Sequence, residues 1–150
     1  MADQSTAQAA KASFLPAMRE LVRAYQAFSS YSEAHIRQFN LTPAQFDVIA
    51  TLGNTNGLSM GEIGEKTLIT KGTLTGVIDR LVQKQLVFRE VPADNRRNVI
   101  VQLTPQGQQV FEQSFPSHIS HLKERFNRLQ PTEIATLTSL LIQLKQAFQR

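Results

Sequence analysis

Apolar side chains recur every three or four residues along both ends of the chain, and this helical spacing constrains the fold more than any other feature. Residues 14–39 carry one such stripe and are expected to form a single long helix, which Pro16 should bend or delay near its start. A second stripe occupies residues 105–129, where Pro116 should kink or break the helix, and a third begins at Pro131. Because the joint apolar surface exceeds what one protomer can bury, we expect these helices to meet and to interlock with a second copy in a two-fold homodimer.

Three helix-start signals follow one another in the middle of the chain. Thr42 precedes a proline and stands three residues before a glutamine, Ser59 stands three residues before Glu62, and both arrangements match a capping box. The third start lies at Thr70. The first two helices are expected at residues 43–52 and 60–67, and the third buries Leu74, Val77, Ile78 and Leu81. Two short helices joined by a tight turn have the layout of a helix-turn-helix.

The apolar pattern changes from helix to strand after Gln85. Residues 86–91 and 99–103 are rich in β-branched side chains, and a polar turn segment separates them, which indicates a β-hairpin. The expected fold class is therefore mostly α with a small β-hairpin. Its domains are a compact central unit, residues 41–104, and a helical part to which both termini contribute, residues 1–40 and 105–150.

Composition and motif content exclude several functional classes. The 150 residues include 41% apolar side chains, enough to bury a core, but no cysteine, which excludes disulfides, cysteine-ligated metal sites and thiol chemistry. Residues 1–11 are small and polar and apolar runs are short, so we expect no signal peptide, no membrane partner and a cytoplasmic location. The sequence lacks a phosphate-binding glycine motif, a nucleophile elbow and paired carboxylates, so we expect neither an enzyme nor a cofactor.

The charge of the chain favours a polyanionic partner. The formal net charge is +4 and the pI is near 9.8. Residues 66–97 carry the whole excess, with seven basic residues against three acidic ones. The basic residues are Lys66, Lys71, Arg80, Lys84, Arg89, Arg96 and Arg97. This clustering within a helix-turn-helix layout favours nucleic acid.

Two parts of this basic segment carry side chains suited to DNA. At the hairpin tip Asp94 precedes Arg96 and Arg97, so a carboxylate can orient a protruding guanidinium toward a minor groove. A solvated turn with a surface ion pair explains the same residues equally simply. The third central helix begins with short hydroxyls and glycines, which either permit close approach to bases and phosphates or mark an ordinary capped helix. These residues are Thr70, Lys71, Gly72, Thr73, Thr75 and Gly76.

Residues 41–107 contain a series of short motifs. These are Leu58-Ser59 with Glu62-Ile63, the run from Ile69 to Leu81, Val87 and Arg89, Asp94-x-Arg96, and Val101-x-Leu103-Thr104-x-x-Gly107. Taken together, they resemble the MarR family of winged helix-turn-helix transcription regulators. The helices on either side match the family's dimerisation domain in length and order. The fold that this resemblance implies is a winged helix-turn-helix with dimerisation helices from both termini.

The resemblance also implies a function and roles for individual residues. Family members are homodimers on pseudo-palindromic operators in double-stranded DNA and usually act as repressors. The helix from Thr70 would be the recognition helix, with the six small or basic residues named above facing the major groove or its phosphates. Arg96 would reach the minor groove with Asp94 orienting it, and Arg97 lies beside it. Many members lose DNA affinity when a small aromatic or anionic ligand binds between the dimerisation and DNA-binding parts.

Three departures from the family pattern bear on this interpretation. Many members carry glycine where Gln85 stands, so the bend before the first wing strand is expected to differ. Many carry a basic or amide residue where Gly76 stands, which removes one candidate base reader. Members that sense peroxides use cysteine, and the lack of cysteine excludes direct thiol sensing here.

Aromatic and histidine side chains near the end of the first long helix have two interpretations. Tyr31, His35 and Phe39 would either line a ligand pocket or serve core and dimer packing. His118 and His121 lie one turn apart on a later helix and would suit a metal-responsive regulator, with Glu33 or Glu124 adding an oxygen ligand. Since no third ligand position follows from the sequence, we assign no metal site.

A second alternative is a winged-helix module that binds protein and does not read DNA. Such a module is expected to expose aromatic or methionine side chains on its third central helix. The small and basic residues found there favour DNA instead.

Overall fold

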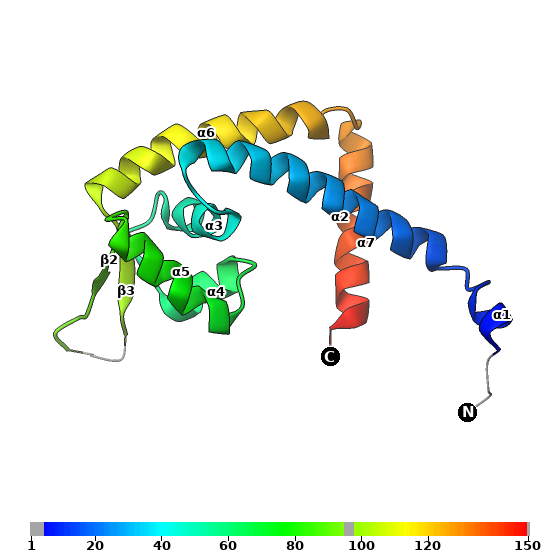
Figure 1. Ribbon diagram of the computed structural model, residues 1–150, viewed down its shortest axis with the longest axis horizontal. Coiled ribbons are helices and arrows are strands. Elements are labelled where there is room, and N and C mark those ends of the chain that lie inside the picture. The colour runs from blue at the N-terminus through cyan, green and yellow to red at the C-terminus, as the bar shows by residue number, and fades with distance from the viewer. Residues whose placement is uncertain (1–4, 95–97, 150) are drawn as a thin grey trace.

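The computed structural model of the chain describes residues 5–94 and 98–149. It confirms a mostly helical fold with a small antiparallel sheet (Figure 1). In chain order the elements are α1 (Thr6–Ala9), α2 (Leu15–Ile36), the 3-10 turn η1 (Arg37–Phe39), α3 (Pro43–Leu52), β1 (Leu58–Ser59), α4 (Met60–Lys66), α5 (Lys71–Gln83), β2 (Val87–Glu90), β3 (Ile100–Leu103), α6 (Pro105–Phe126) and α7 (Pro131–Phe148). Every helix within the described residues is too short or too polar to cross a bilayer.

The helix starts in the centre of the chain follow the caps that the sequence indicates. The Thr42 hydroxyl accepts a hydrogen bond from the Gln45 amide at 3.2 Å, and the Gln45 side chain accepts one from the Thr42 amide at 3.1 Å. Ser59 and Glu62 make the same reciprocal pair at the start of α4. These contacts satisfy backbone N–H groups that a helix end leaves without a partner, so α3 and α4 begin where predicted.

The sheet has one strand more than the sequence indicates. β3 lies between β1 and β2 and pairs antiparallel with both, with Leu58 opposite Val101 and Val87 opposite Leu103. β1 contains only two residues, too few to show alternation, and it forms because β3 offers it a free edge. The core of this unit is made of fully buried side chains from helices and sheet together, including Val48, Ile49, Ile63, Ile78, Leu81 and Val101.

Two expectations about the long helices need correction. The first long helix ends at Ile36; η1 and then Asn40, at a φ of 58°, turn the chain toward α3, so residues 37–39 are not α-helical. α6 continues through Pro116 as one helix and ends at Phe126, so the expected break is wrong. Pro116 and Glu112, whose carbonyl loses its helical donor there, are both exposed, and solvent can replace the missing hydrogen bond.

The wing, which is the hairpin of β2 and β3, is joined to α6 by a close backbone contact. The Leu86 carbonyl accepts a hydrogen bond from the Thr104 amide at 3.0 Å, and the Thr104 hydroxyl donates to the Gln85 carbonyl at 2.6 Å. A Cβ on Gly107 would lie only 1.9 Å from the Leu86 carbonyl oxygen, so only glycine allows this approach. Gln85 itself takes a left-handed φ of 62°, the bend that glycine makes in many family members.

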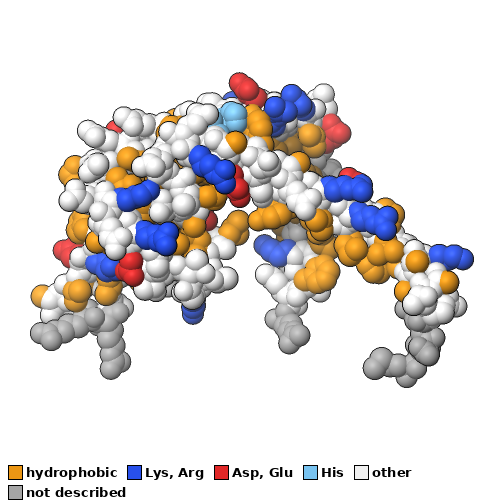
Figure 2. Space-filling model, viewed as in Figure 1, with side chains coloured by type: hydrophobic (Ala, Val, Ile, Leu, Met, Phe, Trp, Pro, Cys, Tyr) orange, Lys and Arg blue, Asp and Glu red, His pale blue; other side chains and the backbone are white. Residues whose placement is uncertain are grey.

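The terminal helices leave their apolar stripes uncovered in a single chain. α2 and α6 pack against each other, whereas α7 turns steeply away from the end of α6 and buries none of its residues (Figure 1). Figure 2 shows hydrophobic side chains exposed along α2. The exposed large apolar residues of these helices include Phe14, Met18, Leu21, Val22, Tyr25, Phe28, Ile119, Phe126, Leu137, Leu140, Leu141, Ile142, Leu144 and Phe148. This surface is of the kind that soluble proteins cover with a partner.

Replacing Gln85 with glycine is expected to stabilise the protein. Side chains other than glycine are strained at the φ of 62° found there, so Gln85→Gly should raise the free energy of unfolding by about 1 kcal/mol. The measurement is chemical denaturation followed by circular dichroism. The control Gln109→Gly, on the exposed face of α6, should lower the free energy of unfolding by about 1 kcal/mol. A decrease for both variants would contradict the strain at residue 85.

Candidate nucleic-acid interface

The first two turns of α5 present a smooth, exposed face. Leu74, Ile78 and Leu81 anchor the helix in the core. All six residues that the sequence indicates as DNA contacts on this helix are exposed: Thr70, Lys71, Gly72, Thr73, Thr75 and Gly76. A Cβ added to Gly72 or Gly76 would meet no protein atom within 4 Å. The glycines are therefore not required for packing within the described chain. They allow another molecule to approach the backbone of α5 closely.

The N-terminus of α5 keeps its backbone donors available. The Thr70 hydroxyl donates to the Thr73 hydroxyl at 3.1 Å, and no described side chain accepts from the first amides of the helix. This differs from α3 and α4, whose first turns are capped by Thr42 and Ser59. The Thr73 amide donates to the Thr70 carbonyl at 3.0 Å, which leaves the amides of Lys71 and Gly72 without an acceptor among the described residues. Free N–H groups at a helix start, with the Lys71 ammonium beside them, attract anionic groups such as phosphates.

The wing is held against α5 by an ion pair between strand and helix. The Arg89 guanidinium donates to the Asp79 carboxylate, and Gln102 donates to Glu90 across the sheet at 2.9 Å. Asp94 is exposed at the end of the described part of the wing. Arg96 and Arg97 lie outside the described residues, so the structure does not place them relative to Asp94 or α5.

The turn between α4 and α5 contains a feature that sequence reasoning missed. Leu68 is 97% exposed, and its amide donates to the Asp47 carboxylate at 3.1 Å. Thr67 donates to the Ile63 carbonyl at 2.8 Å and ends α4. An apolar side chain held outside the core beside the exposed α5 face is available for an external contact. A lone leucine in a turn carries no signal of exposure, because its surroundings depend on the fold.

All three histidines of the chain meet where α2 and α6 pack. The Nδ1 atoms of His35 and His118 are 2.9 Å apart, so one ring must donate to the other. The His118 Nε2 lies 3.2 Å from the Ser32 hydroxyl, and the rings of His35 and His121 stack at 4.1 Å. The Tyr31 hydroxyl donates to the His121 carbonyl at 3.0 Å. We call these five residues the histidine cluster; the sequence placed its members on two helices but not against one another.

Burial disfavours the charged form of two members of the histidine cluster, His118 and His35. It is the main cause that lowers the pKa of His118 to about 4, and His35 and His121 add to the effect. Burial, followed by the charge of His121, also lowers the pKa of His35. Phe46 of α3 packs its ring edge-on against His118 at 4.8 Å, which extends the cluster to the central unit. Protonation of these rings would therefore disturb a junction of three helices.

The three predicted ligand-pocket residues do not line one common cavity. Tyr31 lines a cavity of about 400 Å³ toward Leu137, and the Arg125 guanidinium lies 4.5 Å from its ring. His35 is held between Phe39 and His121, and Phe39 packs against the core. A different cavity of about 500 Å³ separates α2, α3 and α6 and is lined by Ser32, Ile36, Phe46, Phe115 and His118 among others. The assignment of Tyr31, His35 and Phe39 to a ligand site thus stays a prediction.

The described residues provide no set of metal ligands for the metal-responsive alternative. Residues 5–94 and 98–149 contain no group of three or more histidine, aspartate or glutamate side chains placed to hold one ion. His118 instead uses its ring nitrogens toward Ser32 and His35.

The neutral His118 is expected to make stability depend on pH. Its pKa is near 4 in the folded chain and 6.5 ordinarily, so the unfolded chain binds more protons between these values. The free energy of unfolding should fall as the pH drops from 6.5 toward 4, by at most about 1.4 kcal/mol per pH unit for this group. Denaturation at several pH values should show a flatter profile for His118→Gln.

Glu62→Gln is the matched control for this pH series. Hydrogen bonds from the Ser59 backbone and side chain lower the Glu62 pKa from 4.5, so its contribution is lost only below that pH. The control should keep the slope between pH 6.5 and 4.5. An unchanged slope in His118→Gln would refute the assignment.

Comparison with known proteins agrees with this architecture. The family model described as the MarR family matches residues 39–97. The HTH-type transcriptional regulator MhqR of Bacillus subtilis is 31% identical over 121 residues, which cover 81% of this chain and 83% of that protein.

Two solved structures extend the comparison. The structure of Bordetella bronchiseptica BpsR, from work on regulation of its DNA binding by 6-hydroxynicotinic acid, has a TM-score of 0.76 and 31% identity over 85% of this chain and 91% of that one. The structure of a mutant MarR from Escherichia coli complexed with operator DNA has a TM-score of 0.77 and 26% identity over 87% of this chain and 94% of that one. The chain belongs to the MarR family.

Proposed function

We propose that the protein is a cytoplasmic, homodimeric, sequence-specific DNA-binding repressor that a small ligand releases from its operator, and that it is not an enzyme. In this proposal residues 41–104 bind DNA, and residues 1–40 and 105–150 join the two copies. The observation that carries it is the exposed α5 face, whose two glycines meet no protein atom and whose first amides no described side chain caps. The similarity to MarR complexed with operator DNA supports the same function.

In the proposed readout, α5 and the wing contact different grooves of the DNA. Thr70, Lys71, Gly72, Thr73, Thr75 and Gly76 face the major groove, where hydroxyls and amides bond bases and phosphates. Arg96, with Arg97 beside it, enters the minor groove, whose negative potential attracts guanidinium groups, and Asp94 orients it. Repression then follows from occupation of the operator, which excludes other proteins from the same DNA.

The proposed dimer is supported by the uncovered apolar stripes. α7 buries no residue within its own chain although it carries Leu137, Leu140, Leu141 and Leu144. Exposed apolar residues on α2 and α6 extend the same surface. A second copy related by a two-fold axis covers all three stripes and presents two recognition helices about one DNA turn apart, roughly 10 base pairs.

The proposed ligand response is supported by the cavity among α2, α3 and α6. Its volume of about 500 Å³ lies within the range of small-molecule sites. The structure of BpsR was described in terms of regulation by an aromatic acid, 6-hydroxynicotinic acid. We propose that this cavity takes a small aromatic or anionic ligand. Tyr31, His35 and Phe39 stay the ligand residues expected from the sequence, although none of them lines this cavity.

Selection of bound duplexes from a random pool tests the function directly. At near-physiological salt the purified protein should enrich an inverted repeat, and Arg96→Ala should bind that repeat weakly and with a smaller salt dependence. Sedimentation of the free protein checks that the dimer is present. Enrichment of no sequence by a folded dimer would favour the protein-interaction module, and unchanged binding by Arg96→Ala would contradict the wing assignment.

Gly76→Leu separates DNA binding from stability. A Cβ at this position meets no protein atom, and leucine is the better helix former, so the free energy of unfolding should stay equal or rise by up to about 1 kcal/mol. The bulky apolar side chain would stand between α5 and the groove, and operator affinity should fall at least about ten-fold. Fluorescence anisotropy measures the affinity. Wild-type affinity in this variant would show that the face does not approach DNA.

A further inference from the structure

The lining of the cavity among α2, α3 and α6 is acidic, although the protein is basic. The cavity has a volume of about 500 Å³, and residues of the α4–α5 turn also line it. Its described lining contains two carboxylates, Glu33 of α2 and Asp47 of α3, and neither arginine nor lysine. The chain as a whole carries a net charge of +4, so the charge of this lining is opposite in sign to the overall charge.

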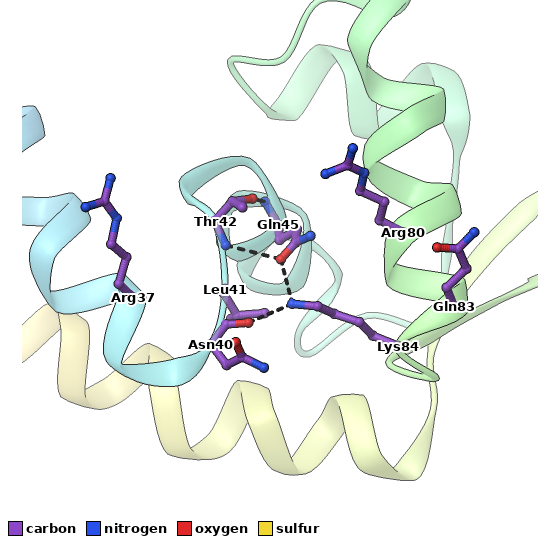
Figure 3. A pocket seen from close by; sticks show the side chains of 8 residues that line it. All are labelled: Arg37, Asn40, Leu41, Thr42, Gln45, Arg80, Gln83 and Lys84. Carbon is purple, nitrogen blue, oxygen red and sulfur yellow. Dashed lines mark hydrogen bonds between the residues drawn. The ribbon is translucent and has the colours of Figure 1, made fainter.

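The two carboxylates have little counter-charge of their own. Asp47 accepts a hydrogen bond from the Leu68 amide at 3.1 Å and forms no ion pair within residues 5–94 and 98–149. Glu33 has one cationic neighbour, Arg37 at 3.8 Å, in an exposed pair of little strength. Arg37 itself lines a separate recess between the η1–α3 turn and α5 (Figure 3). The cavity therefore has negative charge that its own walls do not balance.

The remaining polar groups of the lining carry no positive charge. His118 is 2% exposed, and burial is the main cause that lowers its pKa to about 4, so its ring is neutral near pH 7. Its two ring nitrogens face Ser32 and His35. A carboxylate or phosphate ligand would find no charged donor in this lining, and Glu33 and Asp47 would repel it.

Aromatic rings from three helices make up much of the rest of the lining. They are Tyr25 and Phe28 of α2, Phe46 of α3 and Phe115 of α6. The face of an aromatic ring attracts a cation within about 6 Å of its centre, and the apolar body of a ligand packs well against such rings. Aromatic rings together with carboxylates are the groups that recognise organic cations.

We propose that this cavity binds an aromatic organic cation, a ring system that carries an amine or an amidine. Glu33 and Asp47 pair with the positive head group, and the aromatic rings contact the apolar body. Such a ligand keeps the aromatic character of the ligand proposed above and excludes the anionic one. Its effect on DNA binding rests on the proposed function, whereas its binding to the cavity does not.

A cation at Asp47 would act on the start of α5. The Asp47 carboxylate holds the Leu68 amide, and Leu68 stands two residues before Thr70, the N-cap of α5. The head group of the ligand competes for the same carboxylate oxygens, and Leu68 and Ile69 themselves line the cavity. Binding would therefore shift the α4–α5 turn and lower the affinity of the exposed α5 face for its operator.

Titration calorimetry on the DNA-free, full-length protein at near-neutral pH tests the ligand class. The probes are benzamidinium, benzamide and benzoate, which share one ring and a planar head group but are cationic, neutral and anionic. Benzamidinium should bind saturably and at least about ten-fold tighter than benzamide, and benzoate should bind most weakly. Because the net charge of +4 favours the anion, a preference for the cation must come from the local carboxylates.

Glu33→Gln and Asp47→Asn remove the two charges with little change in shape. A side-chain amide at residue 47 can still accept from the Leu68 amide, so this variant is expected to fold. Each variant should weaken benzamidinium binding at least about three-fold and leave benzamide binding unchanged. Glu20→Gln is the matched control, with the same charge change at an exposed position on α2, roughly 20 Å along the helix from Glu33. It should bind all three probes like wild type.

Each outcome decides the ligand class. A preference for benzamidinium that falls in Glu33→Gln or Asp47→Asn and is kept in Glu20→Gln supports it. Tighter binding of benzoate, equal binding of the three probes, binding of none, or a preference that neither cavity variant changes overturns it. Operator affinity, measured separately by fluorescence anisotropy, tests the proposed function. If benzamidinium binds but operator affinity stays the same, the ligand class stands and release from DNA is refuted.

Discussion

The contact between Leu86 and the start of α6 joins the central unit to the terminal helices, through which we propose that two copies associate. The Leu86 carbonyl accepts from the Thr104 amide, and Gly107 lies against the same oxygen with no room for a side chain. Thr104 also caps α6 and holds the Gln85 carbonyl. The end of α5, the bend at Gln85, the wing strands and α6 therefore form one continuous hydrogen-bonded path. In the proposed dimer, the orientation of α5 relative to the second copy depends on this junction.

The histidine cluster is the second link between the central unit and the terminal helices. It is polar, although apolar side chains would pack equally well at this place. His118 is buried at the centre of α2, α3 and α6, and two neighbours on α2, Ser32 and His35, hold its ring nitrogens. A neutral imidazole satisfied on both nitrogens fits such a place because it needs no counter-ion. The arrangement specifies the angle between α2 and α6 more narrowly than apolar side chains alone, which slide more easily over one another.

Basic side chains stand at both ends of α5, in different surroundings. At its first turn Lys71 stands beside amides that no described side chain caps and glycines that keep the surface low, which suits a polyanion lying across the helix end. At its other end Arg80, and Lys84 just after the helix, line an open recess between the η1–α3 turn and α5, and the buried Gln45 lines the same recess (Figure 3).

The sequence by itself determined the local structure of this protein. The caps at Thr42, Ser59 and Thr104, the exposed face of α5 and the apolar stripes of the terminal helices follow from contacts within four residues, which a pattern in the chain records directly. The MarR resemblance could be recognised in the sequence for the same reason, because its motifs are short and contiguous. Only the tertiary structure decided the rest. The pairing of β1 with β3, the left-handed Gln85, the meeting of three histidines and the recess between the η1–α3 turn and α5 join residues far apart in the chain or depend on what surrounds them. Such contacts depend on the angles at which whole helices pack, and those angles are set by the core as a unit.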